Sequence, residues 1–203
     1  MIKNIIFDVG DVLVEYRWHQ MLMDYGLDKD EAYRLGITIF EDPLWHELDM
    51  AIMDREEVIK SYREKYVEDA DTIEWFINHG EYMHIQRKDV YKLIHKLKEK
   101  GYKIYLLSNY CEDLFKKHTN GAEFLKDIDG KVVSYEVKIT KPDERIYEYL
   151  LEKYSLDRKE CIFFDDREEN VIKARELGIE SFLVKSKESL IEKINELLNM
   201  EEE

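Results

Sequence analysis

Short apolar runs mark the beginning of the chain and recur through its second half. The first run, Ile5–Phe7, is followed directly by the polar residue Asp8. Similar runs occupy positions 104–107, 161–164 and 181–184. Runs of this length without polar alternation are typical of strands that are buried on both faces. The pattern therefore predicts four buried strands.

Helical periodicity fills the intervals between the later strands. Apolar residues at positions 90, 93, 94 and 97 share one helical face, and Gly101 follows as a stop signal. Further helices are predicted over about 144–154, with Pro142 as a helix-starting residue, and over 171–177 and 190–198. Strands that alternate with helices predict an α/β fold, in which a parallel sheet carries helices on both faces.

The region from about 17 to 87 differs from the rest because it is helical and rich in aromatic residues. One helix is predicted to begin at Asp54, with Glu57 completing a capping box, and to place positions 58, 59, 62 and 66 on one face. We therefore predict a core formed by residues 1–14 and 88–203 and an α-helical cap insertion over 15–87. This insertion follows the first strand and is placed to cover the carboxyl ends of the strands.

Composition limits the environment of the protein. Hydrophobic residues make up 44% of the 203 residues, and no run approaches the roughly 20 apolar residues that cross a bilayer. The first residues reach a charge too soon to form a signal peptide. The two cysteines, Cys111 and Cys161, are too few for a disulfide framework or a zinc cluster. We expect no membrane contact and a cytoplasmic location.

The formal net charge of −15 acts against nucleic acid as a partner, and no basic stripe offsets it. The same charge repels phosphorylated small molecules. Phosphate chemistry in this protein would therefore require a metal ion and fixed cations inside the site.

Polar residues follow three of the predicted strands: Asp8, Ser108 and the pair Asp165–Asp166. Ligands of parallel sheets bind beyond the carboxyl ends of the strands. Adjacent carboxylates repel each other unless a cation or a proton relieves them, and oxygen ligands suit Mg²⁺. Each residue also has an ordinary structural explanation: Asp8 as a turn residue, and Ser108 or Asp165 as helix caps. Lys141 is either an exposed lysine or a buried cation for this site.

Four short motifs occur together in this order, and they resemble the motifs of the haloacid dehalogenase-like hydrolase superfamily. They are Asp-Val-Gly-Asp-Val from Asp8, Leu-Ser-Asn ending at Asn109, Lys-Pro-Asp from Lys141, and Phe-Phe-Asp-Asp ending at Asp166. The resemblance covers nearly the whole chain. It implies a Rossmann-like three-layer core with an inserted helical cap. The first motif and the stretch 163–171 resemble the sugar-phosphate phosphatase branch.

The resemblance implies a Mg²⁺-dependent phosphatase that acts on a small phosphorylated metabolite. Asp8 would attack phosphorus and carry the phosphoryl group. Lys141 would pair with Asp8 and the phosphate, and Ser108 and Asn109 would bind phosphate oxygens. The ligands of Mg²⁺ would be Asp8, the carbonyl of Gly10, Asp165 and Asp166. Nothing in the sequence indicates the oligomeric state.

One position departs from the family pattern. Most phosphatases of this superfamily have a second aspartate, the general acid and base, where this chain has Gly10. General acid–base catalysis contributes typically about 10²–10⁴-fold, so a slow enzyme or a substitute is predicted. Asp11 is the nearest candidate, but its one-residue offset directs the side chain elsewhere; a cap residue or water is the alternative.

Specificity is assigned to the predicted cap. Arg17 is predicted to bind an anionic or hydroxylated substrate at the mouth of the pocket, whereas Trp45 and His46 are assigned to core packing. Cys111 is interpreted as an inert packing residue, because nothing near it in the sequence stabilises a thiolate.

Two other functions fit the same fold. A metal-independent dehalogenase also lacks the second aspartate, but it has no need for the pair Asp165–Asp166. A non-catalytic binding or regulatory protein is the other alternative.

Overall fold

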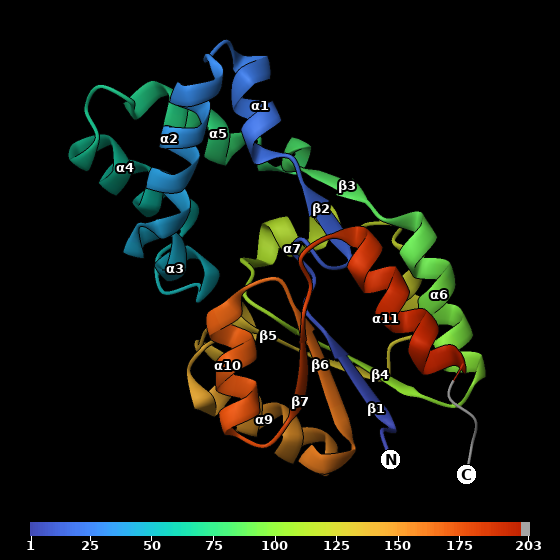
Figure 1. The fold of residues 1–203 in the computed structure, drawn as a ribbon. Helices are drawn as coiled ribbons and strands as arrows, with labels where there is room; N and C mark the ends of the chain where they lie inside the picture. The colour runs from blue at the N-terminus through green and yellow to red at the C-terminus, as the bar shows by residue number, and fades with distance from the viewer. Residues whose placement is uncertain (200–203) are drawn as a thin grey trace.

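A five-stranded parallel sheet forms the centre of the protein. The computed structural model describes residues 1–199 and gives the strand order β5-β4-β1-β6-β7 (Figure 1). The strands are β1 (Asn4–Phe7), β4 (Lys103–Ser108), β5 (Gly130–Val133), β6 (Cys161–Asp165) and β7 (Glu180–Leu183). Four of them correspond to the predicted apolar runs, and the predicted α/β class is confirmed.

Helices cover both faces of the sheet. α6 (Lys88–Glu99) and α11 (Lys187–Asn199) lie on one face, and α9 (Glu144–Tyr154) and α10 (Glu168–Glu176) lie on the other (Figure 1). Side chains of β1 alternate between two buried clusters: Ile5 and Phe7 belong to one and Ile6 to the other. A strand buried on both faces needs apolar residues at every position, which explains the uninterrupted run in the sequence.

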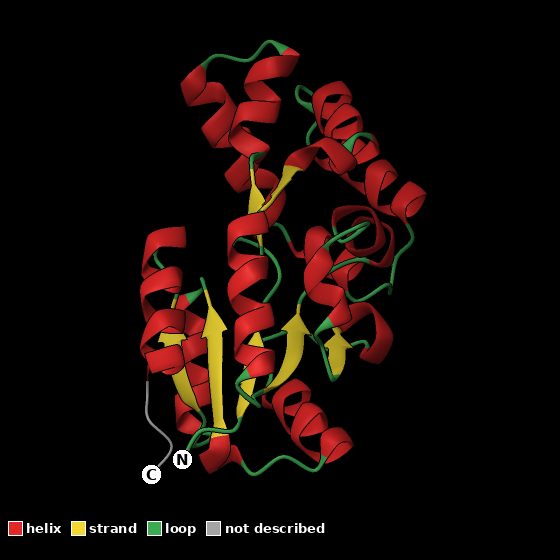
Figure 2. Ribbon diagram, turned by 90° about the vertical axis from the view of Figure 1, so that its right-hand side faces the viewer, coloured by secondary structure: helices red, strands yellow, loops and turns green. Residues whose placement is uncertain are grey.

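Five helices between β1 and β4 form a separate layer beyond the carboxyl ends of the strands (Figure 2). They are α1 (Trp18–Tyr25), α2 (Lys29–Glu41), α3 (Pro43–Asp49), α4 (Arg55–Lys65) and α5 (Ala70–Asn78). An antiparallel ribbon of β2 (Val14–Tyr16) and β3 (His84–Gln86) joins this layer to the core, with a short 3₁₀ turn η1 (Gly80–Met83) before β3. The capping box of Asp54 and Glu57 is present at the start of α4, as predicted.

The remaining elements lie between β4 and β6. They are α7 (Glu112–His118), η2 (Glu123–Lys126), α8 (Ser134–Val137) and η3 (Arg158–Glu160). Within the described residues, no helix combines the length and the apolar character needed to cross a membrane.

The structure corrects three details of the predicted elements. Pro142 lies outside α9, which begins at Glu144, because the Asp143 side chain accepts a hydrogen bond from the Arg145 backbone and caps the helix there. The strand β5 was not predicted, since only its last two residues are apolar. β3 was assigned to the helical region, because its three residues are too short to show a period of two.

Candidate active site

Asp8 lies at the end of the central strand, at the edge where the parallel strands terminate. Its backbone N–H donates to the Phe164 carbonyl at 2.9 Å and so extends the pairing of β1 with β6. Its side chain is largely buried, with the whole residue 8% exposed. Oδ1 accepts a hydrogen bond from Ser108 Oγ at 2.6 Å and lies 3.0 Å from Lys141 Nζ. Two strands and a distant loop thus orient one carboxylate.

Lys141 is a buried cation that faces two carboxylates. Its Nζ lies 2.5 Å from Asp165 Oδ2 and 3.0 Å from Asp8 Oδ1, and it donates to the Leu107 carbonyl at 2.9 Å. The Asn109 side chain makes two hydrogen bonds to the Lys141 backbone, at 2.9 and 2.8 Å. Burial lowers the pKa of Lys141, but the charges of Asp165 and Asp8 outweigh it and the pKa is raised. Lys141 is therefore charged in the folded protein.

The two adjacent aspartates have different surroundings. Asp165 is fully buried, and its oxygens accept from Lys141, from the Arg167 backbone at 2.8 Å and from the Asn170 amide at 3.0 and 3.2 Å. Asp166 is half-buried and lines a cavity. The donors around Asp165 assign it a role in holding Lys141, whereas Asp166 faces open space.

The site carries more negative charge than its own lysine balances. Burial and the charge of Asp8 raise the pKa of Asp165 to about 6 against the opposing effect of Lys141. Burial, followed by the charges of Asp8 and Asp165, raises the pKa of Asp166 to about 8. These directions show that a further cation would stabilise the cluster.

The donor set fits a hard divalent cation. Oxygen atoms of Asp8, Asp165 and Asp166 lie within 4.8 Å of one another. Carboxylate oxygens with an excess of negative charge suit Mg²⁺, which is commonly bound by one or two carboxylates. The three carboxylates that were predicted as metal ligands therefore meet at one place in the structure, and Gly10 lines the same cavity as Asp8 and Asp166.

Tyr16 occupies the space beside Gly10. A Cβ atom at position 10 would lie 2.8 Å from the Tyr16 ring and from its hydroxyl. Asp11 was expected to point elsewhere, but it lines the same cavity; its Oδ1 accepts a hydrogen bond from the Tyr16 backbone N–H at 2.8 Å. The second aspartate of the family pattern is thus replaced by a glycine and a tyrosine that fit each other.

Gly10→Ala is expected to lower the free energy of unfolding by about 1–3 kcal/mol, because the added methyl group overpacks against Tyr16. The double variant with Tyr16→Ala is expected to cost less than the sum of the two single variants. Urea unfolding of the four proteins measures this coupling. Strictly additive costs would contradict a contact between the two positions.

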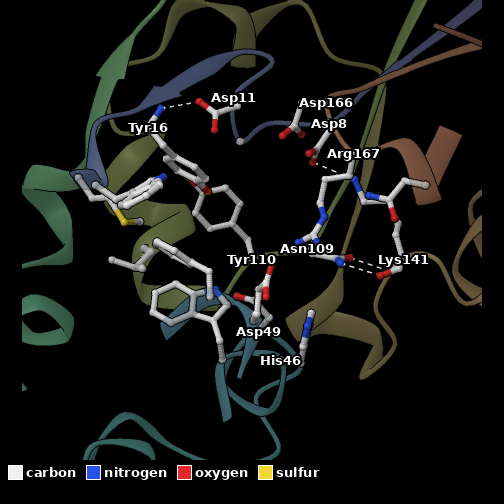
Figure 3. Close-up of a pocket in the computed structure, with 18 of the residues that line it drawn as sticks. Asp8, Asp11, Tyr16, His46, Asp49, Asn109, Tyr110, Lys141, Asp166 and Arg167 are labelled. Atoms are coloured by element: carbon white, nitrogen blue, oxygen red, sulfur yellow. Dashed lines mark hydrogen bonds and ion pairs between the residues drawn. The ribbon is translucent and has the colours of Figure 1, made fainter. Parts of the chain in front are cut away.

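A cavity of about 350 Å³ opens above the carboxylates. Figure 3 shows Asp8 and Asp166 at one end and Asp49 and His46 at the other (Figure 3). The helical layer contributes most of the apolar wall, with Trp18, Ile37, Phe40 and Trp45. Trp45, assigned to core packing, packs against Phe40 and also lines the cavity, as does the half-buried His46.

Arg17 is not brought to this cavity. Its guanidinium group pairs with Asp24 and donates to the Tyr82 carbonyl at 3.1 Å, next to the β2–β3 ribbon. Cys111 is buried, and burial raises the pKa of its thiol to about 12, in agreement with an inert packing residue.

Among the polar residues that line the cavity, sequence reasoning did not single out Asp49, Tyr110 and Arg167, whereas it expected Tyr16 near the mouth of the pocket. Asp49 ends a helix of the inserted layer, and no motif marks it. Arg167 directly follows the acidic pair and Tyr110 directly follows the Leu-Ser-Asn motif, and these positions are the signals that were available. Asp49 reaches the cavity only through the packing of the inserted layer on the core.

Comparison with known proteins gives the class. The model of the haloacid dehalogenase-like hydrolases matches residues 2–178. The chain belongs to this family and is a hydrolase, as the resemblance of its motifs implied.

Individual relatives are distant. D-ribitol-5-phosphate phosphatase of Bacteroides thetaiotaomicron is 26% identical over 90% of this chain and 91% of its own length. A drimenol cyclase of Aspergillus calidoustus is 24% identical over 94% of the chain, which spans only 35% of that relative.

Solved structures share the fold. An enzyme of the family from B. thetaiotaomicron, in complex with magnesium and inorganic phosphate, has a TM-score of 0.70 at 26% identity and covers 92% of this chain and 96% of its own. L-2-haloacid dehalogenase from Xanthobacter autotrophicus has a TM-score of 0.65 at 17% identity. The match covers 97% of this chain and 83% of the dehalogenase.

Proposed function

We propose that this hydrolase is a Mg²⁺-dependent phosphatase that cleaves a small phosphate monoester through an aspartyl-phosphate on Asp8. The observation that carries the proposal is the carboxylate of Asp8, which Ser108 and Lys141 orient at one end of a cavity beside two further carboxylates. The similarity to a phosphatase and to a magnesium–phosphate complex supports the same chemistry.

The residues of the chain divide the reaction between them. Asp8 attacks phosphorus, the ester oxygen leaves as an alcohol, and water then releases orthophosphate from Asp8. Lys141 compensates negative charge on Asp8 and on the transferred group. Asn109 fixes the backbone of Lys141 and lines the cavity, and its backbone would contact phosphate oxygens. Ser108 holds Asp8 through its hydroxyl.

Asp8, Asp166 and the carbonyl of Gly10 would hold Mg²⁺. Asp165 would contribute less to holding the ion, because both of its oxygens already accept hydrogen bonds within the protein. When bound, the ion neutralises phosphate charge and aligns the ester for in-line attack.

The inserted segment, residues 15–87, acts as the cap that selects the substrate. Its aromatic side chains face the carboxylates across a cavity of about 350 Å³, which suits a small metabolite. Sugar phosphates fit this size and agree with the D-ribitol-5-phosphate phosphatase relative. The net charge of −15 agrees with a protein that does not bind nucleic acid.

Orthophosphate release from a panel of phosphorylated metabolites tests the proposal. We expect turnover of at least one sugar phosphate with Mg²⁺ and its loss with a chelator. Chloride release from 2-chloropropionate without metal would instead identify a dehalogenase. Binding of a phosphorylated metabolite without turnover would indicate a non-catalytic protein, and either result would overturn the proposal.

A further inference from the structure

The proposed phosphatase lacks a proton donor at the usual position. Tyr16 fills the space beside Gly10, and burial raises the pKa of its hydroxyl well above 10. A hydroxyl of this kind remains protonated and does not activate water. A group that both donates and accepts a proton would therefore come from elsewhere in the cavity.

Asp49 is the buried carboxyl that the inserted layer presents to this cavity. It is the last residue of α3 and is 7% exposed. Figure 3 shows it across the cavity from Asp8 and Asp166 (Figure 3). The aromatic wall is formed by neighbours on the same layer, including Trp45 and Phe40.

The core anchors Asp49 although the residue belongs to the insertion. Ser134 Oγ, in α8, donates to the Asp49 carbonyl at 2.7 Å, and Lys138 Nζ donates to the Ala51 carbonyl at 2.6 Å. These contacts fix the backbone at Asp49 relative to the core, which favours a defined position of the side chain, as a catalytic group requires.

The surroundings of Asp49 suit proton transfer near neutral pH. Burial, followed by the charge of Asp8, raises its pKa to about 7, against the hydrogen bond from Cys111 and the charges of Arg167 and Lys141. General acids and bases work best when their pKa lies near the operating pH. The titratable and charged groups that face it are Asp8, Tyr16, His46, Tyr62, Tyr110, Cys111, Lys141 and Arg167.

We propose that Asp49 is the general acid and base of the reaction and replaces the aspartate that is missing at position 10. When Asp8 bonds to phosphorus and the ester P–O bond breaks, the carboxyl proton of Asp49 passes to the leaving oxygen and yields the alcohol. The Asp49 carboxylate then takes a proton from water as the water oxygen bonds to phosphorus. The bond to Asp8 breaks, orthophosphate leaves, and Asp49 is protonated again.

This inference rests on the proposed function, and leaving-group dependence tests it. Phenyl phosphate and p-nitrophenyl phosphate have similar shapes, but only p-nitrophenolate leaves readily without a proton. In Asp49→Asn, first-turnover phenol release is expected to fall by about 10²–10⁴-fold and p-nitrophenolate release by less than about tenfold. Rapid-quench measurement is also expected to show accumulated phosphoenzyme, because water is no longer activated.

Three comparisons make the result decisive. Glu47→Gln makes the same charge change on α3 and is expected to match the wild type with both esters. Asp49→Glu keeps a carboxyl group at a shifted position. It is expected to lose less activity than Asp49→Asn, again more with phenyl phosphate than with p-nitrophenyl phosphate, and it replaces Asp49→Asn in the test if that variant does not fold. The wild-type rate with phenyl phosphate is expected to fall above pH about 7, and this limb is expected to vanish in Asp49→Asn.

Equal losses with the two esters would show a merely structural role and overturn the assignment, as would an unchanged rate. If the wild type with Mg²⁺ hydrolyses neither ester and no phosphorylated metabolite of the panel, the proposed phosphatase function fails instead. The two failures are therefore distinct.

Discussion

Asp8→Asn is expected to lower the rate of orthophosphate release by on the order of 10⁴- to 10⁶-fold, the range observed when the nucleophile of an enzyme or a residue that activates it is removed. The asparagine oxygen still accepts from Ser108, so the site keeps its shape. It cannot form the aspartyl-phosphate, and labelling with radioactive phosphate ester is expected to disappear with the activity.

The free energy of unfolding distinguishes the loss of the nucleophile in Asp8→Asn from a loss of activity through unfolding. Removal of one carboxylate from an overcharged cluster is expected to leave the free energy of unfolding of the metal-free protein unchanged or higher at neutral pH. Asp30→Asn, on the exposed surface of α2, serves as the control and is expected to retain full activity. Residual labelling of the Asp8→Asn protein would place the nucleophile elsewhere.

Lys141→Met is expected to damage both activity and stability. Loss of one partner from a buried ion pair typically costs about 3–5 kcal/mol. Here the loss leaves Asp8 and Asp165 without their cation. We also expect a fall in turnover on the order of 10²- to 10³-fold, as for removal of one electrostatic donor. Lys96→Met, an exposed lysine of α6, is the matched control.

The pH dependence of the Lys141→Met effect has a definite sign. The pKa values of Asp165 and Asp166, about 6 and about 8, lie above the usual 3.8. When a carboxyl binds its proton more tightly in the folded state, the folded protein loses stability as the pH rises from the usual pKa of 3.8 through the raised pKa. Without Lys141 these pKa values rise further. Urea unfolding in chelator is expected to show a small gap from wild type near pH 4 and a wide gap at pH 8; an equal gap would contradict this electrostatic origin.

Much of the fold follows from local sequence patterns. β1 and β6 are predictable because burial on both faces demands uninterrupted apolar runs, and α4 because its capping box is local. The pairing of polar residues at the strand ends then follows from the parallel sheet. β5 escapes prediction since two apolar residues do not define a period, and its place at the sheet edge depends on tertiary packing.

In the candidate site, too, the residues that local motifs mark are predictable and those placed by tertiary packing are not. Asp8, Ser108, Lys141 and the pair Asp165–Asp166 were predicted together because each follows a strand or opens a motif, and the structure brings them together. Arg17 was placed at the pocket by its position alone, yet its guanidinium group finds Asp24 and a backbone carbonyl nearby. Asp49 reaches the cavity through the docking of α3, which no local pattern encodes.

The fit between Gly10 and Tyr16 also constrains how this protein changes over evolutionary time. An aspartate introduced at position 10 meets the Tyr16 ring before it can serve any purpose. A smaller residue at position 16 must therefore come first, although it opens a hole while position 10 is still glycine. The order of substitutions therefore matters, and a single substitution at position 10 does not by itself supply a working acid there.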